Sequence, residues 1–375
     1  MKRTINWKRI GIAVIIGILF LAILVKCNQF EKTELISTKG QNYEKAVVTK
    51  ITRDNRAEDG KRYGTQEVKV EIKSGTLKGK VVTAVNPDGS LFGAECKVGT
   101  KVIVIVNQSG KNVSATVYSQ DRTMAIYGFV LIFAAVVCAI GGKKGVQAIA
   151  SLVFAFVCII YLMFPLIYQG YSAIWLAVIV SVLTTIITLG LLGGFTSKTV
   201  SAIIGTTCGV AIAAIAAILF GKAAGITGYN VSDIETLNFV GQNTQIKIGQ
   251  LLFAGIIISA LGAVMDVGMS IASTIQEIHE TDPTLSKERL FLSGIHVGRD
   301  MMGTMTNTLI FAYVGGSMTT LITNYAYNLP YQQLANSYVM GIEIMQGLSG
   351  SLGVVLTVPI TAFVAVFLVK RKQKD

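Results

Sequence analysis

Residues Leu251–Glu280 have the sequence LLFAGIIISALGAVMDVGMSIASTIQEIHE. The apolar run from about 250 to 276 is longer than the roughly 20 residues that a helix needs to cross the hydrocarbon core of a bilayer. Asp266 lies inside this run, and polar residues follow it at helical spacing. The stretch predicts a membrane-spanning helix that carries an acid, and an ionisable residue in such a place is a functional-site hypothesis.

The composition predicts the same class for the whole chain. Of its 375 residues, 52% are hydrophobic and 14% are charged, whereas soluble domains carry about 25% charged residues. The apolar residues are clustered in runs of about 20, the length of a membrane-spanning helix. We predict an α-helical polytopic membrane protein with about eight transmembrane helices, at residues 10–25, 124–140, 146–167, 172–192, 199–220, 250–276, 299–323 and 345–369.

The stretch between the first two spans differs from the rest. It holds most of the charge and has no run of lipid length, and apolar residues alternate with charged ones in EVKVEI (Glu67–Ile72) and in part of KVIVIV (Lys101–Val106). Gly75, Gly79 and Pro87-Asp88-Gly89 are turn signals between such stretches. About five short strands are expected, which predicts a small extracytoplasmic β-rich domain, with an OB-like barrel as one form of it.

These patterns divide the chain into four parts. They are 1–27, an N-terminal cytoplasmic tail and anchor helix; 28–122, the extracytoplasmic β-rich domain; 123–370, a seven-helix membrane domain; and 371–375, a basic cytoplasmic tail. The first span is interpreted as an uncleaved anchor, because Lys26 stands where a signal cleavage site needs small residues. Cys27 and Cys96 fall in one soluble segment, so a disulfide between them is an open alternative.

Lys and Arg residues are distributed unequally between the loops. With the N-terminus placed inside, the inner segments hold fourteen and the outer loops 168–171, 221–249 and 324–344 hold two, Lys222 and Lys247. This excess orients the protein with both termini in the cytoplasm of a bacterial plasma membrane. The inner basic residues would meet the anionic inner leaflet of the lipid bilayer, so the formal net charge of +12 needs no nucleic acid as a partner. The inner residues are Lys2, Arg3, Lys8, Arg9, Lys143, Lys144, Lys198, Lys287, Arg289, Arg299, Lys370, Arg371, Lys372 and Lys374.

The acid-bearing span carries a narrow polar stripe. At about 100° per residue, its polar and small residues fall within roughly 40° on either side of Asp266. The stripe consists of Ser259, Gly262, Asp266, Ser270, Ser273 and Glu277. So narrow a polar stripe is expected to face protein or water and not lipid.

The following span carries a second polar stripe, formed by Asp300, Thr304 and Asn307 in RDMMGTMTNTL. The two helices are joined through the cytoplasmic segment 277–298, so they are expected to be antiparallel neighbours. At the helical rise, Asp266 and Asn307 would lie about 13 and 12 Å from the inner interface and therefore level with each other. Asp300 would lie at the inner mouth.

Asp266 has two interpretations. An ionised aspartate at that depth is unfavourable by about 2.5–3.5 kcal/mol, and an acid balanced between burial and nearby donors can exchange a proton or hold a cation. Ser270, Thr304 and Asn307 would then serve as neutral ligands. The structural alternative is a protonated Asp266 that is hydrogen-bonded to Asn307 and joins the two helices.

Two charged residues lie at the ends of spans. Arg299 either anchors its helix at the inner face or forms a gate pair with Asp300 at the cytoplasmic mouth. Glu343 opens the last span near the outer face, with Gly347 and Gly350 on the same side. It is either an acid at an outer mouth or an ordinary boundary residue.

Two further patterns concern packing and connection. Gly205-xxx-Gly209 has the spacing that lets membrane helices approach closely. The segment 221–249 is long for a loop between membrane helices, and a short helix at Val231–Val240 is one expectation for it.

Other chemistries are not indicated. His279 and His296, with the acids near them, lack the spacing of a compact metal site, so no metal is predicted. Asp266 and Asp300 differ by roughly 12 Å in expected depth, whereas an aspartyl protease needs its two carboxylates at one level. No phosphate-binding loop, nucleophile elbow or nucleotide fingerprint occurs. We therefore predict no enzyme activity and no cofactor.

The long motifs around the two stripes resemble a known family. GAVMDVGMSIASTIQEIHE and LSGIHVGRDMMGTMTNTLIFAYVGGS are similar to the YibE/F-like family of bacterial multi-spanning membrane proteins, as are IGGKKGVQAIASL, LLGGFTSKTVSAIIGTTCGVAIA and GKAAGITGYN. The similarity covers about residues 120–369. It implies a plasma-membrane protein with the topology above, and it assigns no substrate and no catalytic residue.

Two functions from different classes are consistent with these patterns. The first is a transporter or ion-coupled permease for an unknown solute or ion, with Asp266 and Asn307 on a polar path. The second is a membrane-embedded accessory or assembly protein that docks partners through its outer β-rich domain, in which case the polar stripes hold helices together. A second membrane protein or a homo-oligomer is a further expected partner.

Overall fold

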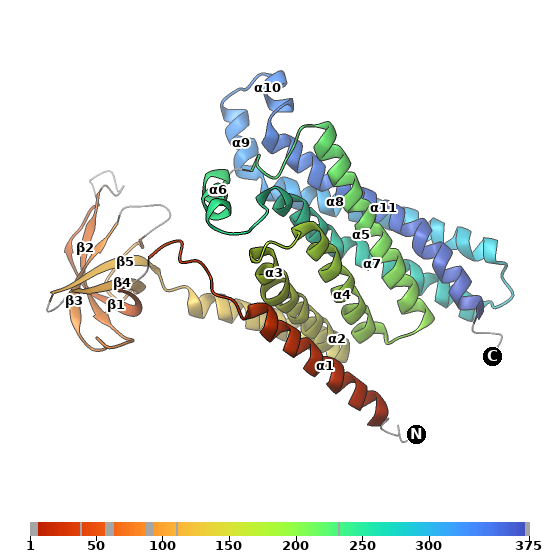
Figure 1. Cartoon of the computed structure of the whole chain (residues 1–375), viewed down its shortest axis with the longest axis horizontal. Helices are drawn as coiled ribbons and strands as arrows, with labels where there is room; N and C mark the ends of the chain where they lie inside the picture. The colour runs from red at the N-terminus through yellow and green to blue at the C-terminus, as the bar shows by residue number, and fades with distance from the viewer. Residues whose placement is uncertain are drawn as a thin grey trace. The chain divides into compact units, whose positions relative to one another are not determined.

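The computed structural model of the chain describes residues 7–37, 40–56, 64–87, 93–109, 112–231 and 233–371. The chain forms two compact units, Glu34–Val137 and a second one made of Met1–Thr33 with Cys138–Asp375. The first unit contains a β-barrel and the second a bundle of helices (Figure 1). The predicted turn at Asp88-Gly89 and the basic tail beyond Arg371 lie outside the described residues.

Five described strands form the barrel: β1 (Gln41–Arg53), β2 (Gln66–Ile72), β3 (Val81–Asn86), β4 (Lys101–Ser109) and β5 (Asn112–Gln120). The barrel closes in the order β1-β2-β3-β5-β4, with β3 parallel to β5. The alternation in β2 creates the core, because Val68 and Val70 are fully buried while Lys69 between them is exposed. A small β-barrel domain is therefore confirmed, and its OB-like character stays a prediction.

Two buried amides join segments inside the barrel. Gln66 Oε1 accepts a hydrogen bond from Asn86 Nδ2 at 3.0 Å, and Gln66 Nε2 donates to the carbonyl of Cys96 at 3.3 Å. Asn86 also donates to the carbonyl of Ala94 at 2.7 Å and accepts from its N–H at 3.0 Å. Because buried polar groups need such partners, these bonds hold the segment before β4 against β2 and β3.

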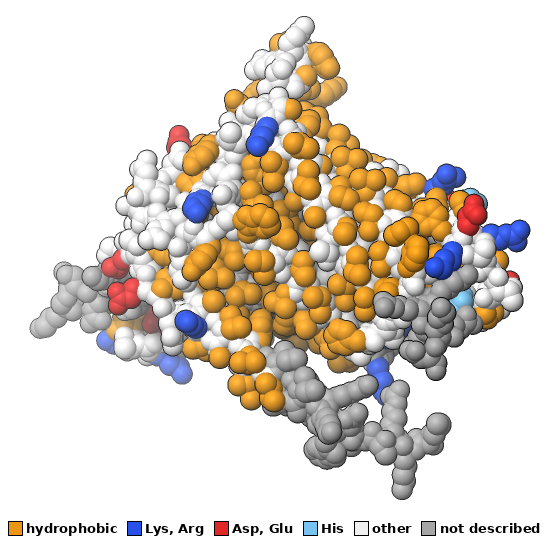
Figure 2. Space-filling model, turned by 45° about the vertical axis from the view of Figure 1, so that its right-hand side comes forward, with side chains coloured by type: hydrophobic (Ala, Val, Ile, Leu, Met, Phe, Trp, Pro, Cys, Tyr) orange, Lys and Arg blue, Asp and Glu red, His pale blue; other side chains and the backbone are white. Residues whose placement is uncertain are grey.

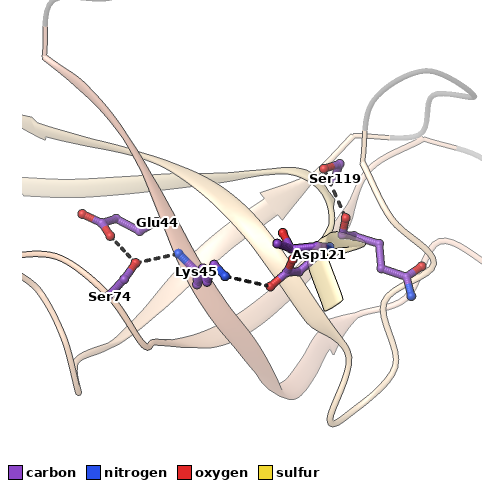
Figure 3. A network of polar contacts seen from close by, with 7 residues as sticks. Glu44, Lys45, Ser74, Ser119 and Asp121 are labelled. Carbon is purple, nitrogen blue, oxygen red and sulfur yellow. Dashed lines mark hydrogen bonds and ion pairs between the residues drawn. The ribbon is translucent and has the colours of Figure 1, made fainter. Parts of the chain in front are cut away.

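A polar network on the barrel surface ends at the start of the next helix (Figure 3). The backbone N–H of Lys45 donates to Ser74 Oγ at 2.8 Å, and the Ser74 hydroxyl donates to Glu44. Lys45 Nζ lies 3.8 Å from Asp121 Oδ2. Asp121 also accepts from the N–H of Thr123 at 3.0 Å. Hydrogen bonds from Thr123, assisted by the Lys45 charge, lower the pKa of Asp121 below its ordinary value.

Helices make up most of the remaining chain. They are α1 (Trp7–Asn28), α2 (Thr123–Val157), η1 (Cys158–Met163), α3 (Phe164–Tyr168), α4 (Ala173–Gly193), α5 (Ser197–Ala223), α6 (Ile234–Asn243), η2 (Ile248–Gln250), α7 (Leu251–Thr281), α8 (Lys287–Gly316), α9 (Met318–Ala326), α10 (Tyr331–Ala335) and α11 (Tyr338–Arg371). Figure 2 shows hydrophobic side chains over much of one face of the molecule, with a group of charged side chains at its right-hand edge. Such a surface suits helices that contact lipid.

α5 and α11 pack against each other through glycines. A Cβ atom at Gly205 or Gly209 of α5 would overlap the hydroxyls of Thr361 and Thr357 on α11. Only glycine therefore lets the two helices come so close, as the spacing of these two residues predicts. The paired positions increase along α5 while they decrease along α11, so the two helices are antiparallel.

α8 is antiparallel to both α7 and α11. A Cβ atom at Gly294 would lie 2.7 Å from Ile275 Cδ1 of α7, and one at Gly298 would lie 3.2 Å from Ile271 Cδ1. Gly298 also lies against Val358 of α11. With these directions, the α7–α8 connection, the start of α1 and the end of α11 lie toward one end of the bundle (Figure 1).

A proline accounts for the irregular stretch of η1 and α3. Pro165 has no N–H to donate to the carbonyl of Tyr161, four residues earlier, and the helix takes the wider π form at Cys158–Met163. The side chain of Asn28, the last residue of α1, supplies a donor instead, with Nδ2 at 2.7 Å from the Tyr161 carbonyl oxygen. α1 is therefore held against η1 by a polar contact.

Five helical segments among the described residues are long and apolar enough to cross a membrane: Thr123–Tyr168, Ala173–Gly193, Ser197–Ala223, Ile248–Thr281 and Tyr338–Val369. The predicted count of about eight is not confirmed. The predicted spans 124–140 and 146–167 lie within one of these segments, on either side of Gly142, whose backbone is not helical (φ 52°, ψ −128°). Within the part of α1 whose side chains the structure describes, the apolar stretch Gly17–Asn28 is short. α8 carries Arg299-Asp300 and many polar residues, which lower its hydropathy.

The structure also tests the predicted cysteine pair and the predicted helix after α5. Cys27 and Cys96, both among the described residues, belong to different units and are not joined by a disulfide. The connection after α5 contains α6 at Ile234–Asn243, three residues later than the helix expected at Val231–Val240.

We expect Gly209→Ala to destabilise the helical unit by about 1–3 kcal/mol, because the added methyl group overlaps Thr357 at a contact that has no room for it. The matched control is Gly303→Ala, where a Cβ meets nothing within 4 Å, so helix propensity should make it neutral or stabilising by up to about 1 kcal/mol. Thermal unfolding in detergent measures both. Equal melting temperatures for the two variants would contradict the packing argument.

We expect Thr123→Val to raise the pKa of Asp121 toward the ordinary aspartate value, because the variant removes the largest cause of its lowering. Because the pKa of Asp121 is lower in the folded than in the unfolded chain, its ionised form stabilises the barrel at pH values above the unfolded pKa. This stabilisation is lost as the pH falls through the folded pKa. Carboxyl NMR titration of a segment spanning 34–125 measures the pKa. Thr100→Val is the control, because the Thr100 hydroxyl accepts from the N–H of Lys97 and is bonded to no carboxylate.

Candidate functional site

α7 has an apolar face and a polar face. Val264, Val267, Ile271 and Ile275 on the apolar face are all 0% exposed. Asp266 lies about 200° around the helix from Val264, on the opposite face, and it is exposed. The predicted stripe forms this outer face: Ser259, Gly262, Asp266 and Glu277 are exposed, and Ser270 and Ser273 are half-buried.

α8 is less enclosed than α7. Among the described residues of α8, those that are buried are Leu290, Gly294, Gly298 and Leu309. The second stripe lies about 180–240° around the helix from Gly298, and therefore on the side opposite the packing contacts. Its residues Asp300, Thr304 and Asn307 are exposed, as is the neighbouring Arg299.

Contacts between α7 and α8 fix the register of the two stripes. The hydroxyls of Ser259 and Tyr313 lie 2.7 Å apart, and Ile271 lies against Gly298 further along. Because the helices are antiparallel, the residues between these pairs are matched in opposite order. Position 266 of α7 is therefore level with about positions 303–306 of α8.

This register brings Asp266 level with Thr304 and within about one turn of Asn307. Within the described chain, no hydrogen bond or ion pair joins the Asp266 carboxylate to the α8 stripe. The structure thus places the central residues of both stripes at one depth on the surface of a single chain, without linking them. The titratable acid and the structural hydrogen bond both stay predictions.

Three helices meet at the end of the stripes nearer α9. The Ser259 hydroxyl of α7 contacts Tyr313 of α8, and Tyr313 and Glu343 of α11 line a common groove of about 390 Å³. The other residues of the groove are almost all apolar, among them Ile310 and Gly347. Glu343 therefore lies near the end of the α7 stripe, in a position that its own sequence context did not reveal.

The other end of the stripes lies at the α7–α8 connection. Asp282 Oδ1 accepts from the hydroxyl of Thr284 at 2.6 Å and from its N–H at 3.0 Å, and these bonds lower the pKa of Asp282. They shape the turn that reverses the chain. Arg299 and Asp300, both described, form no ion pair with each other, so the gate pair stays a prediction.

The histidines do not assemble a metal site in the part of the chain that the structure describes. No group of three or more His, Cys, Asp or Glu side chains is placed to hold a metal ion there. His279 is buried on α7, whereas His296 is exposed on α8.

Sequence reasoning missed a groove beside α7, on the side that faces η1 and α3. It has a volume of about 620 Å³ and lies between η1–α3 and α7, with Met163, Ile167 and Ala254 among its apolar walls. Ser259 is its one hydroxyl besides that of Tyr168. Two residues were sequence signals for this groove. Pro165 widens the helix that faces α7, and Gly255 leaves open space, because a Cβ there would meet nothing within 4 Å. Neither shows from sequence alone which helices face each other.

Long apolar helices and a stripe-bearing bundle define the chain as a polytopic helical membrane protein. The family model described as YibE/F-like protein matches residues 129–371. The chain belongs to the YibE/F-like family, which confirms the resemblance seen in its motifs. No curated protein and no solved structure matches it.

Proposed function

We propose that this protein is a transporter or ion-coupled permease of the bacterial plasma membrane, with a polar path along the outer faces of α7 and α8. Asp266 and Asn307 would lie at the centre of that path. The observation that carries the proposal is an exposed carboxylate halfway along a helix whose other face is completely buried.

The energetic argument concerns what covers Asp266. A charged side chain facing acyl chains at the centre of a bilayer costs about 2.5–3.5 kcal/mol or more. A face that combines Asp266 with the serines of the same stripe is therefore expected to contact water or another protein. In a single chain this face is uncovered, so a second copy or a second membrane protein is the expected partner that encloses the path.

Each stripe residue has a proposed role. Asp266 exchanges a proton or holds a cation, while the neutral side chains offer oxygen ligands along the way. Asp300 and Arg299 occupy the inner mouth, and Glu343 with Tyr313 occupies the outer mouth. The neutral and acidic residues assigned to the path are Ser270, Ser273, Glu277, Thr304 and Asn307.

We infer a topology of eight spans with both termini in the cytoplasm and residues 28–122 outside. The direction of α1 supports it. Phe20 and Asn28 of α1 lie against Phe154 and Tyr161, so α1 is parallel to the helical run that ends at Tyr168. Two parallel spans require the chain to cross back between them, and 124–140 is the apolar segment available for that crossing. A bilayer with an anionic inner leaflet is the matching environment.

The competing proposal is an accessory or assembly protein that docks partners through the barrel. It is favoured by the separation of the barrel into its own compact unit, Glu34–Val137. In that case the polar stripes serve for association between membrane helices. Neither proposal involves an enzyme activity, a cofactor or nucleic acid.

In proteoliposomes we expect flux of a proton or a small cation that falls to the protein-free background in Asp266→Asn. The variant keeps the size and polarity of the side chain but cannot ionise. A pH-sensitive dye and a panel of cation gradients measure the flux, and Glu235→Gln, an exposed acid on α6, is the control that should keep it. Full activity of Asp266→Asn would exclude the titratable acid. Absence of wild-type flux under every gradient, with a partner that co-purifies, would favour the accessory role.

The topology gives a separate expectation. In a chain without native cysteines, Thr76→Cys in the barrel should react with a membrane-impermeant thiol reagent on intact cells. Thr284→Cys at the α7–α8 connection should react only after the cells are opened. Both side chains are exposed, so accessibility within the fold does not limit either reaction. The opposite labelling pattern would invert the proposed orientation.

A further inference from the structure

A polar cavity of about 770 Å³ lies where three distant segments of the helical unit meet. They are residues 30, 31 and 33 after α1, residues 168–171 from the end of α3 to the start of α4, and residues 242–245 from the end of α6 toward η2. None of these residues belongs to the α7 or α8 stripes. The cavity is thus a second polar feature, independent of the proposed path.

Hydrogen bonds and ring contacts hold the first two segments together. Gln169 Nε2 donates to the carbonyl of Cys27 at 2.9 Å, and the N–H of Thr33 donates to Tyr168 Oη at 2.8 Å. The rings of Phe30 and Tyr168 lie 5.3 Å apart between centroids, within the range of a favourable aromatic pair. The chain that leaves α1 is therefore fixed as a wall of the cavity.

The third segment is fixed against the second. Gly170 has φ +91°, and a Cβ there would lie 3.1 Å from Gln245 Cβ, so this close approach requires glycine. Just beyond, Gln250 Oε1 accepts from the Ser172 hydroxyl at 2.8 Å and from the N–H of Ala173 at 3.0 Å, which caps α4. The cavity is accordingly built before any ligand arrives.

The lining favours an uncharged ligand that is rich in hydroxyl groups. Its side chains are mainly amides, hydroxyls and aromatic rings, and Glu31 is the one charged residue among them. An amide both donates and accepts hydrogen bonds, as a hydroxyl does, and aromatic faces cover apolar C–H surfaces. The absence of Lys and Arg from this lining disfavours a phosphate group, which those residues normally bind.

The apolar groove between η1–α3 and α7 adjoins this cavity. Tyr168 lines both of them. Gln245 and Ile246 are consecutive in the chain, and Gln245 lines the polar cavity while Ile246 lines the apolar groove. Tyr171 and Trp175 nearby are 57% and 69% exposed, as expected for aromatic residues at the level of lipid headgroups. A polar chamber at headgroup level thus continues into an apolar groove along the helices.

We propose that these joined spaces bind one lipid with an uncharged sugar headgroup, such as a diglycosyl diacylglycerol. The sugar occupies the amide-lined cavity, and an acyl chain lies in the groove beside η1. This binding site goes beyond the proposed transport role and does not depend on Asp266.

The test is native mass spectrometry of the full chain with added lipid. A polyoxyethylene detergent is required, because maltoside detergents carry the headgroup chemistry under test. Diglucosyl diacylglycerol is expected to bind about tenfold more tightly than phosphatidylglycerol. Preference for phosphatidylglycerol, or equal binding of the two lipids, overturns the proposal.

Variants of the cavity and of the groove test the contributions of the headgroup and of the acyl chain separately. The double variant Gln242→Leu with Gln245→Leu should weaken binding of the glycolipid about tenfold, whereas Gln332→Leu with Gln333→Leu, exposed on α10, should not. Gly255→Leu fills the groove and should weaken it as well, whereas Gly17→Leu on α1, also with open space around its Cβ, should not. Thermal unfolding confirms that each variant is folded.

Two further binding measurements distinguish the glycolipid from other classes of ligand. Maltose alone should bind much more weakly than the glycolipid; equally tight binding that Gly255→Leu leaves unchanged would indicate a free-saccharide site and overturn the proposal. Glu31→Gln should change glycolipid binding less than twofold, because the headgroup is uncharged. A large loss in that variant would indicate a cationic headgroup instead. All of these outcomes are independent of whether the protein transports protons or cations.

Discussion

Glycines at positions 205 and 209 bring α5 into direct contact with α11, and α7 packs against both helices at that contact. Lipid gives apolar helices little reason to associate, so close packing has to supply the attraction. The hydroxyl of Thr357, which meets Gly209, bonds back to the carbonyl of Gly353 in its own helix at 2.7 Å and so needs no other partner. α7 then inserts its apolar face, and its acid-bearing face is left on the outside.

The sequence predicts the class of this protein far better than the arrangement of its parts. Apolar runs and low charge are properties of single segments, and so is the alternation in Glu67–Ile72. The break between the predicted spans 124–140 and 146–167 is also visible in the sequence, because Gly141-Gly142-Lys143-Lys144 interrupts the apolar run where the backbone of Gly142 is not helical. Helical periodicity placed Asp266 on a polar face, but it could not tell whether that face is inside or outside the bundle. That distinction depends on which helices are neighbours.

The two polar regions of the helical unit differ in chemistry. The stripe of α7 and α8 includes the carboxyl groups of Asp266 and Asp300. The cavity at the end of α3 is lined mainly by amides and rings. No window of sequence could have found it, because Phe30, Tyr168 and Gln245 come from segments far apart in the chain. A protein with both features has one surface suited to charge and another suited to a neutral ligand.

Pro165 has a mechanical consequence. The carbonyl that it leaves at Tyr161 accepts a hydrogen bond from Asn28, and Gln169 donates to the carbonyl of Cys27, so two polar contacts hold the end of α1. Sliding α1 by one helical turn, about 5.4 Å, would break both of these bonds at once. The C-terminal end of α1 is therefore an anchored point, and the chain that leaves Asn28 enters the wall of the cavity from a fixed position.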